Sequence, residues 1–292
     1  MDLLSTSFLF SQFLDQRRYL KNVTPGTIEW YETAFKAFQR AHDTRDPPLT
    51  KASLQQFVVS ARQRGVKPIS CNTYIKALNA FCLWLRDEGL ASERVELSLL
   101  RVEKRLIVTL TDEQMQVLLH QKPKRFDAWR LHALICLLLD VGLRIEEALT
   151  LRRTDLDFDN LLVTVFGKGR KERRVPFSFE LRKVLFRYDQ LRVRQCARCE
   201  LFFPSRQGTG WDQRNSLRGL HILQEKLALQ MFGWHRLRHT FATNYLRQGG
   251  DIVRLSMVLG HTQITTTQRY LHLLTEDLSA SHQKVSILNR LG

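Results

Sequence analysis

The chain contains 292 residues, which is enough for two domains that each bury a hydrophobic core. Its apolar content of 43% and charged content of 25% are ordinary for a soluble globular protein. The formal net charge of +16 is not ordinary. It favours a polyanionic partner, most directly nucleic acid, over a protein that is merely basic.

The cysteines and the apolar runs predict a cytoplasmic protein. Five cysteines at scattered spacing do not form a secreted disulfide framework, and Cys71, Cys82 and Cys136 lie in apolar helical patterns typical of a core. No basic leader or cleavage site accompanies the short apolar patch at 8–10. The apolar run at 133–139 is far too short to span a bilayer, so we expect no membrane segment.

The first third of the chain predicts a bundle of four helices. Pro25 after Thr24, then Thr50, then Ser70 are typical of helix starts, because these side chains cap or tolerate free backbone N–H groups. Apolar residues then recur at helical spacing and give each helix one buried stripe. The segment 91–105 is charged and weakly periodic, so we interpret it as the linker between domains 1–103 and 104–292.

The remaining two thirds predict more helices and a small sheet. Thr111, followed by two acidic residues in the first turn, indicates a helix start. Alternating apolar residues at 161–165, and Val175 after the turn 167–171, predict a β-hairpin. Further helices are expected over 131–139, 145–151, 179–191 and from 217 almost to the end. The fold class is therefore mainly α with a small β-sheet (α+β).

Side chains suited to phosphate chemistry gather near the C-terminus. On a helix, His235, Arg238 and His239 share one face, since they lie at i, i+3 and i+4. Gly260 favours a left-handed helix end directly before His261, with Thr262 as the cap of a short helix leading to Tyr270. Arginine binds phosphate oxygens through a planar fork, histidine moves protons near neutral pH, and tyrosine can act as a nucleophile.

Each of these residues also has a structural interpretation. A lone histidine is usually a satisfied core or surface residue, and Tyr270 could be an ordinary half-buried tyrosine. Arg144 and Glu147 could form a surface ion pair, and the basic turn at 168–174 could be solvated or could only track phosphates. The grouping favours a functional site, because polar groups on one face are costly in a core.

Five boxes together resemble the signatures of the tyrosine recombinase (phage integrase) family. They follow one another in the family's order over residues 110–275, and the N-terminal bundle resembles the family's core-binding domain. The boxes are Arg144 within Gly142-Leu143-Arg144-Ile145-Glu146-Glu147, the turn from Gly167 to Arg173, His235-x-x-Arg238-His239, Leu259-Gly260-His261, and Tyr270. The resemblance implies a bundle that binds DNA joined to a catalytic domain, in a protein of the Xer or transposon-associated kind.

The resemblance implies a role for each residue of these boxes. Tyr270 would attack a scissile DNA phosphate and form a 3′-phosphotyrosyl intermediate, while Arg144 and Arg238 would clamp the non-bridging oxygens. Lys168, which aligns with the family's turn lysine better than the alternative Lys171, would protonate the leaving 5′-oxygen. His235 would be the general base or assist proton transfer.

Three further side chains complete the implied catalytic set. His261 would donate a hydrogen bond to the phosphate, whereas Glu147 and His239 would support the site. Five cationic or protonatable groups would neutralise the anion without a metal or other cofactor. The Cys196-x-x-Cys199 pair lacks a second ligand pair at suitable spacing for zinc.

The exposed basic residues of the turn are expected to contact double-stranded DNA; they are Arg170, Lys171, Arg173 and Arg174. The resemblance implies a site-specific recombinase that proceeds through a Holliday junction, in integration, excision or resolution. It also implies a homotetramer on two paired sites, possibly with a related recombinase, in which a tail helix at 278–291 docks on the neighbouring protomer. A type IB topoisomerase and a non-catalytic DNA-binding protein remain the alternatives.

Overall fold

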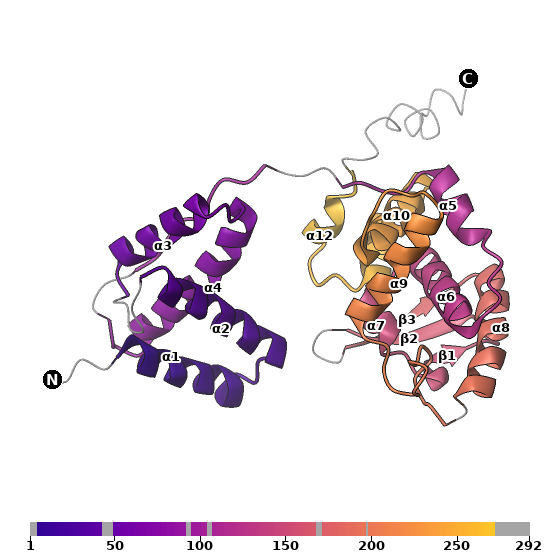
Figure 1. The fold of residues 1–292 in the computed structure, drawn as a ribbon, viewed down its shortest axis with the longest axis horizontal. Helices are drawn as coiled ribbons and strands as arrows, with labels where there is room; N and C mark the ends of the chain where they lie inside the picture. The colour runs from indigo at the N-terminus through magenta and orange to yellow at the C-terminus, as the bar shows by residue number, and fades with distance from the viewer. Residues whose placement is uncertain are drawn as a thin grey trace, which may run out of the picture. The chain divides into compact units, whose positions relative to one another are not determined.

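A computed structural model describes residues 5–42, 49–91, 95–103, 107–167, 171–196 and 198–271. The chain divides into two compact units, residues 1–105 and 106–292 (Figure 1). No helix in the described part is long and apolar enough to cross a membrane. Lys168, Arg170 and the tail helix expected at 278–291 lie outside the described residues.

The first unit contains the four helices that the sequence predicts, with a short π-helical extension of the first. Their bounds are α1 (Thr6–Asp15), η1 (Gln16–Leu20), α2 (Pro25–Arg40), α3 (Lys51–Gln63) and α4 (Pro68–Asp87). Aromatic rings fill the core, where Phe10 stacks on Phe35 with centroids 4.0 Å apart and meets Phe81 edge-on. Cys71 and Cys82 are buried among them, as expected.

Two of the three expected helix starts in this unit are correct. Thr24 precedes Pro25 at the start of α2, and Thr50 forms a reciprocal capping box with Ser53. The expectation that Ser70 caps α4 is wrong. The helix begins at Pro68, since proline has no N–H to leave unpaired in a first turn.

The segment interpreted as a linker is partly tied to the bundle. Asn79 on α4 donates to the carbonyl of Leu97 at 2.8 Å and accepts from its N–H at 3.0 Å. Asn72, two turns earlier on the same helix, does the same to Leu100, at 2.9 and 2.7 Å. Each amide side chain bonds both the N–H and the C=O of one backbone residue, as a neighbouring strand would in a sheet. Residues 97–100 therefore belong to the first unit.

Replacing Asn79 by Ala should loosen this attachment. The Leu97 N–H and C=O would lose their partners at a part-buried position, so we expect a loss of about 1 kcal/mol in the free energy of unfolding. Hydrogen exchange should accelerate at Leu97, whereas Asn72→Ala should accelerate it at Leu100. The exposed Lys76→Ala variant is the control, and equal exchange in all three variants would contradict the proposed anchoring.

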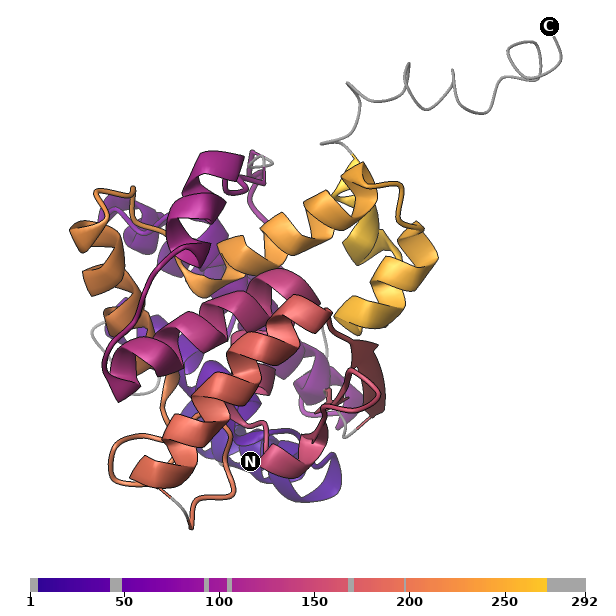
Figure 2. The ribbon, with the colours of Figure 1, turned by 90° about the vertical axis from the view of Figure 1, so that its right-hand side faces the viewer.

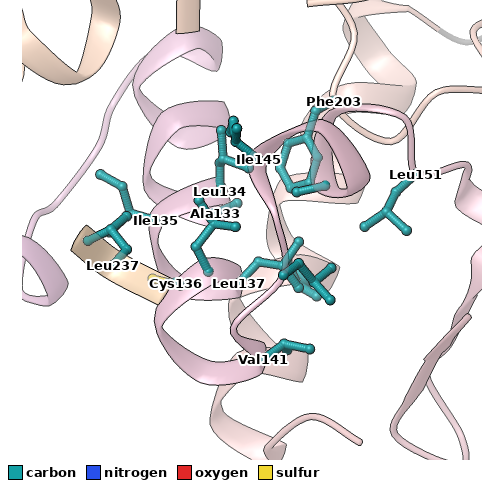
Figure 3. Packing of buried hydrophobic residues seen from close by; sticks show 14 of the residues in the cluster. Ala133, Leu134, Ile135, Cys136, Leu137, Val141, Ile145, Leu151, Phe203 and Leu237 are labelled. Carbon is teal, nitrogen blue, oxygen red and sulfur yellow. The ribbon is translucent and has the colours of Figure 1, made fainter. Parts of the chain in front are cut away.

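Helix α6 is the centre of the second unit. It spans Phe126–Val141, and every residue from 130 to 138 is buried, which explains the continuous apolar run that begins at residue 133. Helices α8 (Phe179–Gln195) and α10 (Trp234–Arg247) pack against it (Figures 1 and 2). Figure 3 shows Leu134, Leu137 and Leu237 in this core. Cys136 is also buried there, as expected.

A three-stranded antiparallel sheet lies beside these helices. Strand β2 (Leu162–Phe166) pairs with β3 (Glu172–Pro176), which confirms the predicted hairpin. A third strand, β1 (Leu156–Asp157), pairs with β2 and was not expected, because two residues are too few to show a periodicity. Helices α5 (Asp112–Leu119) and α7 (Ile145–Leu149) complete the first part of this unit, and Thr111 caps α5 as predicted.

The remaining helices carry the last boxes of the sequence. They are α9 (Gln213–Lys226), α10, α11 (Ile252–Leu259) and the short α12 (Thr265–Gln268). Gly260 ends α11 in the left-handed conformation (φ 64°), as expected. The expectation that Thr262 caps the next helix is wrong, since Ile264 occupies that position.

Candidate active site

Arg144 stands where two helices are joined. Gly142 ends α6 in a left-handed conformation (φ 70°), and Arg144 is the N-cap of α7. Its guanidinium donates to the carbonyl of Leu259 at 3.3 Å and to that of Gly260 at 3.4 Å. The side chain remains 38% exposed, so an incoming anion can reach it.

Glu147 is the buried anion around which the arginines are arranged. Its carboxylate accepts from the backbone N–H of Arg144 at 2.8 Å and from that residue's guanidinium at 3.0 Å. Arg173 binds it with both terminal nitrogens, at 3.0 and 2.8 Å. Arg238 lies 4.0 Å away. Burial opposes ionisation, but the hydrogen bonds from Arg173 and Arg144 outweigh it and lower the pKa of Glu147.

Arg173 is turned inward, which corrects its expected place among the DNA contacts. Besides its bond to Glu147, its Nε donates to the carbonyl of Val258 at 2.9 Å, and the side chain is only 14% exposed. Strand alternation explains this, because Arg173 and the buried Val175 share one face of β3, whereas Glu172 and Arg174 point away. Arg173 therefore joins the hairpin to the end of α11.

Arg238 is the buried member of the cluster. It donates to the carbonyl of Gly142 at 2.8 Å and to that of Leu259 at 2.7 Å, and its side chain is 6% exposed. Burial, then repulsion from Arg144, lowers its pKa to about 10, so it stays charged at neutral pH. Since Arg144 and Arg238 bind the same carbonyl of Leu259, their two guanidinium groups converge on one point.

His261 lies directly beyond Gly260 and is fixed on both ring nitrogens. Nε2 lies 3.1 Å from Nη2 of Arg238, and Nδ1 lies 2.8 Å from Oγ1 of Thr267. Arginine only donates, so we assign Nε2 as the acceptor and place the proton on Nδ1. Burial and the nearby positive charge of Arg238 lower the pKa of His261 to about 4.

Tyr270 is buried, and its hydroxyl is bonded to His239. The Nδ1 atom of His239 lies 2.9 Å from the Tyr270 oxygen, and Tyr270 is only 2% exposed. Burial raises the pKa of Tyr270, while Arg238, Arg269 and Arg144 act in the opposite direction. His235, the residue expected to assist Tyr270, is exposed, with its ring centroid 6.4 Å from that of His239.

The other expected DNA contacts, where described, remain on the surface. Lys171 is exposed at the turn of the hairpin, and Arg174 is 70% exposed. Lys168 and Arg170 belong to the undescribed part of the turn. Cys196 and Cys199 are half-exposed free thiols at the end of α8. In the described part of the chain, no three His, Cys, Asp or Glu side chains are grouped to hold a metal.

This chain belongs to the phage integrase family, whose model matches residues 108–277. Tyrosine recombinase XerA of Thermococcus kodakarensis is 30% identical to it, over 97% of this chain and 95% of the relative. Tyrosine recombinase XerC of Thermodesulfovibrio yellowstonii is 27% identical, over 98% of both chains. The class of enzyme predicted from the sequence, a tyrosine recombinase that breaks and rejoins DNA, is thereby confirmed.

Solved structures share the fold. The Tn1549 transposon integrase bound to transposon right end DNA matches with a TM-score of 0.78 and 18% identity, over 97% of this chain and all of that one. XerH recombinase bound to a palindromic difH substrate matches with a TM-score of 0.72 and 21% identity, over 96% of this chain and 84% of that one. The mainly helical fold with a small antiparallel sheet is therefore confirmed.

The bond between Arg173 and Glu147 should carry a large share of the second unit's stability. Arg173→Ala would leave the buried Glu147 carboxylate with fewer partners, so we expect a loss of about 3 kcal/mol in the free energy of unfolding. Arg174→Ala, at the exposed neighbouring position, should change it by less than about 0.5 kcal/mol. Urea denaturation measures both values, and similar losses in the two variants would contradict the inward assignment.

Two of the histidines with lowered pKa values, His239 and His261, should make folding acid-sensitive. His239 and His261 have pKa values of about 4 when folded, below the value of about 6.5 in an unfolded chain. Between about pH 6.5 and pH 4 the unfolded chain binds more protons than the folded one. The contribution of the two histidines to the free energy of unfolding is therefore complete above about pH 6.5 and is lost as the pH falls towards 4. Melting temperatures should decrease from about pH 7 to pH 5, where most carboxylates stay ionised, and His261→Gln should flatten the decrease. A wild-type melting temperature that stays constant over this range would exclude the effect.

Proposed function

We propose that this chain is a site-specific DNA recombinase whose active centre lies at the carbonyl of Leu259. The observation that carries the proposal is the convergence of Arg144 and Arg238 on that one oxygen, beside His261. The charges of both arginines also act on the pKa of Tyr270. Two guanidinium groups held together repel one another, so an anion placed between them is strongly favoured. A phosphodiester fits, because its two non-bridging oxygens can each accept from one arginine.

The chemistry is a reversible transfer of the phosphoryl group. The Tyr270 oxygen would bond to phosphorus as the bond to the 5′-oxygen breaks, leaving a 3′-phosphotyrosyl link and a free 5′-hydroxyl. The energy of the phosphodiester is kept in this link, so the strand can be rejoined without ATP. Arg144 and Arg238 would stabilise the charge that builds on the non-bridging oxygens in the transition state, with Glu147 and Arg173 holding them in place.

Proton transfers accompany both bond changes. The family resemblance assigns the leaving-group acid to Lys168, which lies outside the described residues. Two histidines on α10, His235 and His239, are available on the side of Tyr270. His261 would donate to the phosphate once the anion displaces Nη2 of Arg238 and the Nε2 atom takes up a proton, which the added negative charge favours.

Duplex DNA is the proposed substrate, and a homotetramer on two sites in the cytoplasm is the proposed assembly. The Tn1549 integrase and XerH structures contain DNA, and a net charge of +16 suits the same ligand here. The exposed Lys171 and Arg174 would contact phosphates, with Arg170 beside them, so affinity should decrease steeply with salt. Residues 1–103 would bind DNA as a core-binding domain, and the tail at 278–291 would dock on a neighbouring protomer.

The two alternatives differ from this function in what they require. A type IB topoisomerase would use the same nucleophile but would relax DNA without a specific site or a paired complex. A non-catalytic DNA-binding protein would not need the hydroxyl of Tyr270. The two relatives are named tyrosine recombinases and match this chain over nearly their whole length, which favours recombination.

Covalent trapping on nicked duplexes from the DNA beside the gene tests the function. A nick near the cleavage point lets the freed strand end diffuse away, so the phosphotyrosyl complex accumulates and the junction can be sequenced. Wild type should form the complex without added metal or ATP, and Tyr270→Phe should form none, because it lacks the nucleophilic oxygen. Tyr245→Phe, on α10, is the matched control and should trap as wild type does. Equal trapping by Tyr270→Phe would refute the mechanism.

A further inference from the structure

Helix α8 carries a row of large apolar side chains on its exposed face. Phe179, Phe186 and Val193 are 54%, 52% and 46% exposed and lie seven residues apart, so they follow one another along a single line of the helix. Leu181 and Leu185 are buried on the opposite face, where α8 packs against α6. Single exposed apolar residues are ordinary, but an aligned row of them is typical of a surface that binds another protein.

A row of positive charges runs beside the apolar row. Arg187 and Arg194 each follow one of its residues along the chain, so they lie on the adjacent line of the helix. Together with Lys124 they line a hollow of about 460 Å³, which the half-buried Trp129 also lines. Among the described residues, no carboxylate forms an ion pair with any of these three cations. The hollow therefore presents unpaired positive charge directly next to exposed apolar surface.

Stacking holds one of the cations in place. The guanidinium carbon of Arg187 lies 4.9 Å from the centre of the Trp129 ring. A stacked guanidinium has lost part of its rotational freedom before any ligand arrives, so pairing with a carboxylate costs less entropy than it would for a free arginine. Arginine and aromatic side chains are also enriched at protein interfaces. The hollow is thus prearranged for a planar acidic group.

Helix α8 lies away from the side chains that would handle the phosphate. Those side chains come from the other helices of the second unit and the connections between them; they are Arg144, Arg238, His261 and Tyr270. In Figure 1, α8 and α12 lie at opposite sides of this unit, and in Figure 2 α8 is at the front. A partner bound to α8 would therefore leave the proposed active centre open.

We propose that the α8 surface, made up of Phe179, Phe186, Arg187, Val193 and Arg194, is the docking site for an acidic amphipathic helix of another protein. Apolar side chains repeated every seven residues on the partner would meet the apolar row, as they do between paired helices. Carboxylates beside that stripe would reach the hollow and bind the arginines through their planar forks. The interaction goes beyond the recombinase function and does not depend on it.

Charge and apolar exposure favour this occupant over two others. DNA phosphates would gain from the cations but not from the exposed phenylalanine rings, whose burial requires an apolar partner. A second copy of this chain carries the same net charge of +16, so two copies repel one another. An acidic amphipathic helix matches both rows at once, because one side of it is apolar and the flank is negative.

Binding of a labelled synthetic peptide to the full chain tests the proposal. The probe is a peptide of three heptads with leucine at the first and fourth positions and glutamate at the flanking ones, and a matched probe carries lysine in place of glutamate. Fluorescence anisotropy at about 0.15 M salt measures both dissociation constants. The acidic peptide should bind at least about 10-fold more tightly than the basic one.

Charge variants locate the bound peptide. Arg187→Glu and Arg194→Glu should each weaken binding of the acidic peptide about 10-fold, because each replaces an attraction in the hollow by a repulsion. Lys226→Glu, at an exposed position of α9, makes the same change in net charge and should weaken binding less than about 2-fold. Equal losses in all three variants would show that the peptide follows net charge alone and would overturn the proposal.

Apolar variants test the other row. Phe186→Ser and Val193→Ser should each weaken binding of the acidic peptide about 5- to 10-fold, since the partner's leucines lose apolar contacts. Ile222→Ser on α9, where the side chain is 58% exposed, is the matched control and should bind as wild type does. Wild-type affinity in both α8 variants would exclude the apolar row from the interface and overturn the proposal.

Two further measurements separate the rival occupants. Affinity for duplex DNA should be equal in Arg187→Glu and Lys226→Glu, and a loss of about 10-fold confined to Arg187→Glu would assign the α8 surface to DNA instead. Light scattering should show that wild type and Phe186→Ser have the same mass in the absence of DNA. A wild-type dimer that Phe186→Ser dissociates would assign the surface to a second copy and would equally overturn the proposal.

Discussion

The ionised carboxylate of Glu147 is the constraint on which the second unit's polar interior depends. It is almost completely buried and binds Arg144 and Arg173, with Arg238 at 4.0 Å, so three cations share one anion. A single negative charge cannot neutralise three positive ones, and the site is left with a surplus of positive charge. Backbone carbonyls at the end of α11 hold the arginines without adding charge. The interior is thereby organised and still attracts an anion, which a fully neutralised network would not do.

The same carbonyls bring together three parts of the chain that are far apart in sequence. Val258 accepts from Arg173 of the hairpin, Leu259 from Arg238 of α10, and Gly260 from Arg144. The left-handed Gly260 turns the chain so that these oxygens face inward. A Cβ at that position would lie 2.8 Å from Nη1 of Arg173, so the absence of a side chain at Gly260 also leaves space for the Arg173 guanidinium. The position of His261 follows from this turn, since it is the next residue.

Local patterns in the sequence were sufficient to predict several helix starts and the hairpin, because neighbouring residues decide these features. Thr50 and Thr111 cap helices as predicted, and alternation located the hairpin. The start of α4 at Pro68 rather than at Ser70 also has a local cause, because proline has no N–H to leave unpaired. Tertiary contacts decided the rest, and the pairing of Asn79 with Leu97 has no local signal. Arg173 could have been recognised as inward, because it shares the strand face of Val175, but a run of basic residues hid the alternation. The proximity of His239 to Tyr270 depends on how α10 meets α12, which spacing alone does not reveal.

The side chains of the site form hydrogen bonds with one another, and an incoming phosphate would have to replace some of these bonds. Arg238 donates to His261, and Tyr270 is bonded to His239. A phosphodiester is a charged acceptor, so its hydrogen bonds to arginine are stronger than the one between Arg238 and a neutral imidazole. Exchange of that partner would free Nε2 of His261 and, by adding negative charge, would raise the pKa values of both histidines. An added negative charge would therefore change the protonation of both rings at once, because it changes the field at each of them.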